Sequence, residues 1–257
     1  MTLGARAPGA RGVAAVDVAF TVEELEHVPL DGRAAVVIDV VRASTTIVTA
    51  LAHGAAAVVP VATPDEAVAR ASAWPGRVLL GGERDGLPPP GFECGNSPAE
   101  YASPRVRGRT IVFTTTNGTR ALLAVTRARA VAVGGFVNAG AIVDWLARGG
   151  GDVVLACSGE TGRFCLEDAT CAGLIVERLQ ERHPGAALSD AARAAAILYR
   201  RYAGDLDGLM TDAAWARALA SRGRGADLPL CATIDAYGVV PVLANGALVA
   251  ALAAGAD

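Results

Sequence analysis

Short runs of apolar, often β-branched residues alternate with helical stretches along the chain, and this alternation restricts the possible folds most strongly. The run at 34–41, AAVVIDVV, is typical of a buried strand, and the stretch at 44–52 is typical of the helix after it. Near-continuous apolar strands separated by helices indicate a mostly parallel sheet with helices on both faces. We therefore predict an α/β fold with strands at 34–41, 57–61, 77–81, 110–114, 130–134 and 152–157.

The C-terminal third is richer in helices than the rest of the chain. Helices are expected at 167–182, 189–203 and 212–222, and a late strand near 239–243 is expected to rejoin the sheet. We predict a single α/β domain over residues 16–257 with a helical insertion near 186–226. A separate helical lobe is the alternative organisation.

The first residues of the chain do not resemble a targeting segment. Residues 1–15 carry Arg6 and Arg11 but lack the apolar stretch of a signal peptide, so we expect a short disordered extension on a cytoplasmic protein. No apolar run reaches the roughly 20 residues that a membrane span needs. We therefore expect no membrane association.

The basic residues are all of one kind, which excludes several chemistries. All 23 are arginine, and the chain contains no lysine. A phosphate-binding P-loop, a protein kinase and Schiff-base chemistry each require a lysine, so none of them is possible. The net charge of −3 argues against a nucleic-acid partner. The five cysteines form no Cys-x-x-Cys pair and the three histidines are scattered, so a structural zinc site is not expected.

Polar clusters follow most of the predicted strands. They lie at 39–46, 83–85, 114–120 and 158–162, with Asn138 after a further strand. In open α/β sheets, ligands bind beyond the carboxyl ends of the strands. If the strands are parallel, these clusters meet at one edge of the sheet, and we predict the functional site there.

The cluster at 114–120 is suited to holding an anion. Gly118 permits a left-handed turn, Thr115, Thr116 and Thr119 carry hydroxyls, and the next helix presents free backbone N–H groups. Arg120 adds a planar fork that matches phosphate or carboxylate. A well-capped turn with no ligand is the alternative interpretation.

Acidic residues at three strand ends are candidate metal ligands. Asp39 ends a buried strand, where a carboxylate needs a metal, a cation or a role in chemistry. Arg42 could be that cation in a purely structural ion pair. Glu83 and Arg84 could reach the site from a mobile loop, although a solvated turn is also typical of such residues. Asp168 opens a helix, where it also complements the helix dipole.

A cysteine-phosphatase loop is a competing hypothesis. Cys157 and Arg163 have the Cys-x5-Arg spacing directly after a predicted strand. With five cysteines and 23 arginines, about 0.4 such matches are expected by chance, so the pattern has low specificity. A nucleophilic thiolate would also need an activating environment.

The motifs together resemble the 2-phosphosulfolactate phosphatase family. The resemblance lies in residues 37–47, 82–86, 91–98, 114–120 and 164–168, with Asn138 between them. It implies a magnesium-dependent acid phosphatase of α/β fold, usually a homodimer, that converts 2-phospho-3-sulfolactate to sulfolactate and phosphate in coenzyme M biosynthesis. Cys94 and Cys165 depart from the expected pattern.

These observations lead to one site prediction. Oxygen ligands are those that Mg²⁺ prefers, and arginines suit a substrate with several anionic groups. The predicted catalytic residues are Asp39, Arg42 and Arg120, and the predicted Mg²⁺ ligands are Asp39, Glu83 and Asp168. The predicted substrate-binding residues are Ser44, Thr45, Arg84, Thr115, Thr116, Asn117, Gly118, Thr119 and Asn138. Whether Asp39 is a nucleophile or a metal ligand is left open, and a non-catalytic binder of small anions is a further alternative.

Overall fold

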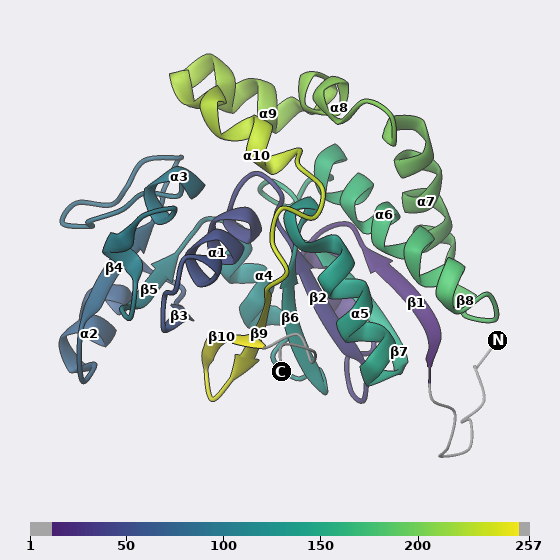
Figure 1. Ribbon diagram of the computed structural model, residues 1–257, viewed down its shortest axis with the longest axis horizontal. Coiled ribbons are helices and arrows are strands. Elements are labelled where there is room, and N and C mark those ends of the chain that lie inside the picture. The colour runs from purple at the N-terminus through teal and green to yellow at the C-terminus, as the bar shows by residue number, and fades with distance from the viewer. Residues whose placement is uncertain (1–11, 252–257) are drawn as a thin grey trace.

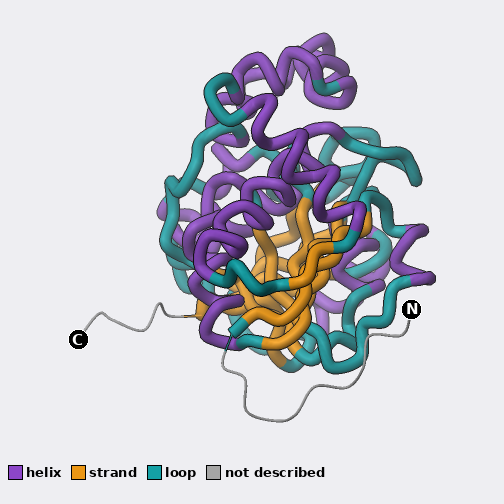
Figure 2. The backbone as a smooth tube through the Cα atoms, turned by 90° about the vertical axis from the view of Figure 1, so that its right-hand side faces the viewer, coloured by secondary structure: helices purple, strands orange, loops and turns teal. Residues whose placement is uncertain are grey.

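A computed structural model describes residues 12–251, which form one sheet with helices on both faces (Figure 1). Figure 2 shows the same molecule turned by 90°, with the strands as a layer between helices. The predicted α/β fold with a mostly parallel sheet is confirmed. No helix within the described residues is both long and apolar enough to cross a membrane.

The sheet has ten strands in the order β4-β5-β3-β10-β9-β6-β2-β7-β1-β8. Two groups of parallel strands are joined by the antiparallel hairpin β9–β10, which pairs with β6 on one side and with β3 on the other. The single parallel edge that we predicted is therefore interrupted by this hairpin. The strands are β1 (Val13–Ala19), β2 (Ala34–Ile38), β3 (Ala57–Pro60), β4 (Val78–Gly82), β5 (Thr110–Thr114), β6 (Ala130–Gly134), β7 (Gly151–Cys157), β8 (Ala187–Leu188), β9 (Val240–Ala244) and β10 (Ala247–Ala251).

Several helices begin at a capping residue or a proline, whereas α1, α4, α5 and α6 have neither a side-chain cap nor a proline at their start. Ser189 caps α7 by accepting a hydrogen bond from the N–H of Ala192, and Pro64 opens α2 after the cap Thr63. The helices are α1 (Ala43–Ala52), α2 (Pro64–Ala73), α3 (Pro98–Tyr101), α4 (Gly118–Ala124), α5 (Ala139–Gly149), α6 (Leu166–Arg182), α7 (Asp190–Tyr202), α8 (Leu206–Asp212), α9 (Ala214–Leu219) and α10 (Leu228–Cys231).

The central strand β2 is buried on both faces, as its apolar run predicts. Val36 and Ile38 pack in the cluster that contains α5 and α6, whereas Ala35 and Val37 pack in the cluster that contains α1 and α4. This division follows from the two-residue period of a strand. It also places Asp39, the next residue, where the strand leaves the core.

Three strands were not predicted. β1 begins at Val13, so the disordered extension expected over residues 1–15 is wrong for 13–15, which join the sheet beside β7. The remainder of that expectation, residues 1–11, lies outside the described residues. β8 and β10 were also missed: β8 has only two residues, and β10 is rich in alanine and has little apolar contrast with its flanks. The late strand expected near 239–243 is confirmed as β9.

The segment predicted as a helical insertion begins with β8 at the edge of the sheet beside β1 and continues through helices α7 to α9. Its helix α7 packs along α6, and the segment from α8 to α10 continues above the sheet (Figure 1). The indole N–H of Trp215 on α9 donates to the carbonyl of Val41 at 2.8 Å. The insertion is thus attached to the loop that follows β2.

The close packing of α6 on α7 depends on Gly173, which gives a test of the fold. A Cβ at this position would lie 2.0 Å from the carbonyl oxygen of Ala195, so Gly173→Ala forces the helices apart. We expect a loss of about 1–3 kcal/mol in the free energy of unfolding, measured by denaturant titration. Gly185→Ala is the control, because nothing lies within 4 Å of its Cβ position. Equal stabilities of the two variants would contradict this packing.

Candidate active site

Asp39 lies directly after β2 and is almost completely buried. Its Oδ1 accepts a hydrogen bond from the N–H of Ala43 at 3.0 Å, and its own N–H donates to Ser44 Oγ at 2.9 Å. The first turn of α1 therefore holds both the backbone and the carboxylate of Asp39. Ser44 was predicted to bind substrate; in the structure its hydroxyl accepts the hydrogen bond from the backbone of Asp39.

Asp168 joins the loops after β2 and β7. Its Oδ1 accepts from the N–H of Val40 at 2.8 Å. Its Oδ2 accepts from Ser158 Oγ at 3.2 Å and from the N–H of Gly159 at 3.3 Å. Asp168, in the first turn of α6, is thereby brought to the same strand ends as Asp39, as the sequence predicted.

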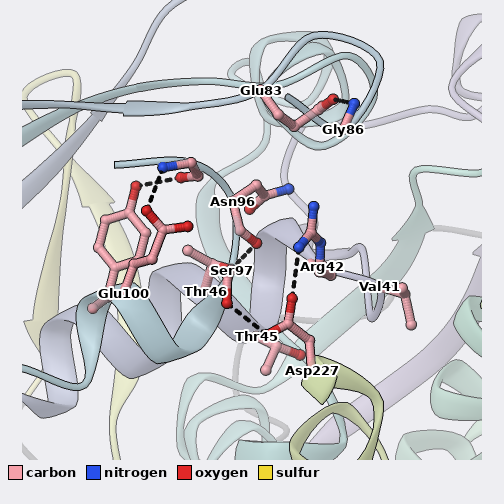
Figure 3. Close-up of polar contacts among 12 residues, drawn as sticks. Val41, Arg42, Thr45, Thr46, Glu83, Gly86, Asn96, Ser97, Glu100 and Asp227 are labelled. Carbon is pink, nitrogen blue, oxygen red and sulfur yellow. Dashed lines mark hydrogen bonds and ion pairs between the residues drawn. The ribbon is translucent and has the colours of Figure 1, made fainter. Parts of the chain in front are cut away.

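Glu83 and Glu160 connect the loops after β4 and β5 with the loop after β7. Glu83 Oε2 accepts from the N–H of Gly86 at 2.7 Å, and its Oε1 accepts from the N–H of Thr116 at 2.8 Å (Figure 3 shows the Gly86 contact). Glu160 accepts from Asn117 Nδ2 at 2.6 Å. The loops after β4, β5 and β7 therefore meet despite the hairpin that divides the sheet.

Gly118 is required for a reason other than the one predicted. Its φ is not positive, so the expected left-handed turn is wrong. Instead, a Cβ at this position would lie 2.7 Å from Asp39 Oδ2 and 2.6 Å from the Cβ of Ala43. Only glycine lets the loop after β5 approach Asp39 this closely.

Burial and mutual repulsion disfavour ionisation of the carboxylates. Burial raises the pKa of Asp39 to about 6; repulsion from Glu83 adds to this effect, and the hydrogen bond from Ala43 opposes it. Burial, with repulsion from Asp39, raises the pKa of Glu167 to about 7. The pKa of Asp168 is raised well above its usual value by burial and by both of these neighbours. A bound cation would relieve the repulsion.

Arg42 is buried at the same strand end, but its ion-pair partner was not predicted. Its Nη1 contacts Asp227 Oδ2 at 2.6 Å, and Ser97 Oγ donates to Asp227 Oδ1 at 2.5 Å (Figure 3). Asp227 comes from the C-terminal end of the insertion. The guanidinium makes no other hydrogen bond within residues 12–251, which leaves the rest of its planar fork for a ligand.

Two other predicted arginines are engaged elsewhere. The guanidinium of Arg84 donates hydrogen bonds of 2.7 to 2.8 Å to the carbonyls of Ala62 and Glu83 and to Thr114 Oγ1. Arg120 is 52% exposed and forms an ion pair with Glu23 at 2.8 Å. No contact within the described residues brings either guanidinium to Asp39.

The predicted amide and hydroxyl groups mostly bind the backbone. Asn138 is fully buried and bridges the turn after β6, its Oδ1 accepting from Gly135 N–H. Thr115 and Thr119 exchange hydrogen bonds across the turn that leads into α4, each hydroxyl accepting from the other residue's N–H at 3.1 Å. Thr45 Oγ1 donates to the carbonyl of Val40 at 2.9 Å. These residues shape the loops, and their direct contact with a substrate stays a prediction.

The structure adds residues that sequence reasoning did not assign to the site. Glu167 is next to Asp168, a predicted metal ligand, and Glu160 lies in the polar cluster at 158–162. Their position in the segment that follows β7 was the signal in the sequence that could have assigned them to the site. Trp215 and Arg222 come from the insertion; the guanidinium of Arg222 stacks on the Trp215 ring at 5.4 Å. Both line a cavity of about 100 Å³ together with Glu83, Thr116, Asn117 and Glu160.

The chemistry of the donors fits a magnesium ion. Within the described residues, no group of three or more His, Cys, Asp or Glu side chains already surrounds one point. Mg²⁺ nevertheless needs only one or two carboxylates, because it retains several water ligands. Glu167 Oε2 is buried and has no hydrogen-bond partner among the described residues, and the pKa values of the nearby Asp39 and Asp168 are raised. A cation would satisfy this oxygen.

The cysteine-phosphatase hypothesis does not fit this geometry. Cys157 is fully buried in the core, where burial raises the pKa of its thiol well above the usual value. Arg163 is exposed on the loop beyond it. A thiol in this position is neither accessible nor readily ionised.

Comparison with known proteins agrees with the phosphatase interpretation. The family model described as 2-phosphosulpholactate phosphatase matches residues 19–246. A protein of Symbiobacterium thermophilum named probable 2-phosphosulfolactate phosphatase is 44% identical over 86% of this chain and 95% of its own length. Proteins with the same name from Thermotoga maritima and Clostridium acetobutylicum are 40% and 34% identical, over 86% and 90% of this chain and 93% and 98% of their own lengths. The chain therefore belongs to the 2-phosphosulpholactate phosphatase family.

Proposed function

We propose that this protein is a Mg²⁺-dependent phosphatase that hydrolyses 2-phospho-3-sulfolactate or a similar small phosphomonoester. The observation that supports this most strongly is the group of buried carboxylates at the strand ends, beside Arg42, the one buried arginine within residues 12–251, whose fork is only partly occupied. The names of the relatives support the reaction class.

Asp39, Asp168 and Glu167 are the residues that we expect to hold the metal. When bound, Mg²⁺ polarises the phosphoryl oxygens and offsets the charge of these carboxylates. Glu83 was predicted as a ligand and stays a candidate: its oxygens accept hydrogen bonds from Gly86 and Thr116, but both oxygens of Asp168 accept hydrogen bonds as well. Glu83 also shapes the loops around the expected metal site.

Arg42 is the residue that we expect to bind the phosphoryl group. Asp227 holds one end of its guanidinium at 2.6 Å, which orients the remaining N–H groups. Such fixed donors stabilise the charge that spreads over the phosphoryl oxygens in the transition state. The homodimer, the cytoplasmic location and the role in coenzyme M biosynthesis that the resemblance implies remain predictions.

Phosphate release tests the proposed function directly. The wild-type protein is incubated with 2-phospho-3-sulfolactate in the presence of Mg²⁺, of excess EDTA, and of EDTA followed by excess Mg²⁺. We expect release only in the first and third conditions. Full activity in excess EDTA would contradict the metal-dependent reaction, and phosphate binding without any release would favour the non-catalytic alternative.

A pair of arginine substitutions tests which guanidinium takes part. Arg42→Lys retains the charge but loses the planar fork, so we expect kcat/KM to fall by about 100-fold or more. Arg120→Lys, at an exposed ion pair, should stay within about twofold of the wild type. Steady-state kinetics measure both, and thermal unfolding shows whether each variant is folded. A large loss for Arg120→Lys alone would reverse the assignment.

The raised carboxylate pKa values predict the pH dependence of stability. The pKa values of Asp39 and Glu167 in the folded state, about 6 and about 7, exceed their ordinary values of 3.8 and 4.5. Between the ordinary and the folded-state values the folded state binds more protons, so its stability falls as the pH rises across this interval. In EDTA, we expect the free energy of unfolding to decrease between about pH 4 and pH 7, and added Mg²⁺ to restore it.

A substitution shows whether Asp39 causes this decrease. Asp39→Asn cannot ionise, so it should lose part of the pH dependence measured by denaturant titration. Asp31→Asn, in an exposed turn, should retain all of it. Stability that is constant or increases over this range in EDTA would show that the carboxylates ionise normally.

A further inference from the structure

The loop between β4 and α3 carries a buried amide without a hydrogen-bond partner. Asn96 is only 6% exposed, and its side-chain Oδ1 is buried with no partner among the described residues. Its Nδ2 donates no hydrogen bond within residues 12–251 either, because the contact that Thr46 makes is with the backbone carbonyl of Asn96. Buried polar side chains are nearly always hydrogen-bonded, so an amide with both ends unpaired is suited to binding a ligand.

The backbone on each side of Asn96 is fixed. Its carbonyl accepts a hydrogen bond from Thr46 Oγ1 on α1 at 3.0 Å. Gly95 donates from its N–H to Glu100 Oε2 at 2.7 Å, and its carbonyl accepts from the Tyr101 hydroxyl at 2.7 Å. Both of these side chains belong to α3, so α1 and α3 hold the loop together. The position of the amide is therefore set before any ligand binds, which lowers the entropy that binding costs.

The amide of Asn96 lies beside the guanidinium of Arg42, with its nitrogen toward the arginine (Figure 3). Asp227 contacts only Nη1 of Arg42, at 2.6 Å, and its other carboxylate oxygen accepts from Ser97 Oγ. The remaining N–H groups of Arg42 and those of Asn96 are thus neighbours, and no acceptor among the described residues receives them. Two sets of unpaired donors side by side form a site for an anion.

These donors suit a phosphoryl group. Its oxygens are strong acceptors that take several hydrogen bonds at once. Arg42 supplies a positive charge, whereas the amide of Asn96 adds N–H donors that stay in place at any pH, because an amide does not titrate. Donors fixed in advance stabilise the negative charge that spreads over the phosphoryl oxygens in the transition state.

We propose that Asn96 is a further substrate-binding residue of this phosphatase, and that its Nδ2 donates to a phosphoryl oxygen held by Arg42. This inference rests on the proposed function and adds a second donor at the place where Arg42 acts. It also gives a role to the segment at 91–98: the loop after β4 binds the reacting group together with the loop after β2.

Two substitutions at Asn96 test the proposal in steady-state assays with 2-phospho-3-sulfolactate and Mg²⁺. Asn96→Ala removes the donor, so we expect kcat/KM to fall by about 100-fold. Asn96→Asp places a carboxylate beside Arg42, and we expect a larger loss because this charge also repels the phosphoryl group. Asn245→Asp makes the same change in the exposed turn between β9 and β10, and it should leave kcat/KM within about twofold of the wild type.

Thermal unfolding separates substrate binding from a structural role. Asn96→Ala removes a buried polar group that has no partner among the described residues, so its unfolding midpoint should equal or exceed that of the wild type. A midpoint several degrees lower, with kcat/KM of the folded variant near that of the wild type, would show that the amide supports the loop and would overturn the inference.

Binding of inorganic phosphate distinguishes failure of this inference from failure of the proposed function. In calorimetry with Mg²⁺, we expect the Kd of phosphate to be about tenfold higher for Asn96→Ala than for the wild type. An unchanged Kd would overturn the inference even where phosphatase activity is confirmed, because Asn96 would then not contact the phosphoryl group. If the wild type binds phosphate but hydrolyses no phosphomonoester, weaker binding by Asn96→Ala would support the inference while the proposed reaction fails.

Discussion

Burial of carboxylates where the strand-end loops meet is the constraint on which the rest of this site depends. Asp39, Glu167 and Asp168 are each at most 7% exposed. Removing such groups from water is costly unless hydrogen bonds or a cation compensate for it. Backbone N–H groups of the loops compensate Asp39 and Asp168, whereas Glu167 Oε2 has no partner among the described residues. The raised pKa values of the three carboxyl groups and the expected need for a cation both follow from this burial.

The helical insertion completes the site from the other side. Asp227 pairs with Arg42, and Trp215 donates to the carbonyl of Val41, so both contacts are made with the loop after β2. These contacts orient the buried arginine that we expect to bind the phosphoryl group.

Sequence reasoning succeeded where the signal is local. The apolar run at 34–41 predicts the buried strand, which the structure has at Ala34–Ile38, and it predicts a carboxylate, Asp39, near the end of that strand. Asp227 could not be found in this way, since 185 positions separate it from Arg42. The sequence also could not show that Arg84 and Arg120 already have partners. Arg84 donates to the carbonyl of Ala62 and Arg120 pairs with Glu23, and both partners are distant in the sequence. For Gly118, the residue type was correctly judged important, but the cause is close approach to Asp39 and not a left-handed turn.

Carboxyl ¹³C NMR titration of the metal-free protein tests the central claim, that burial and mutual repulsion keep these carboxylates from ionising normally. The account predicts a pKa of about 6 for Asp39 and about 7 for Glu167, both falling when Mg²⁺ is added. Asp39→Asn, which removes one charge, should lower the pKa of Glu167. Titration of both groups near their ordinary values of 3.8 and 4.5, with no response to Mg²⁺, would contradict the account.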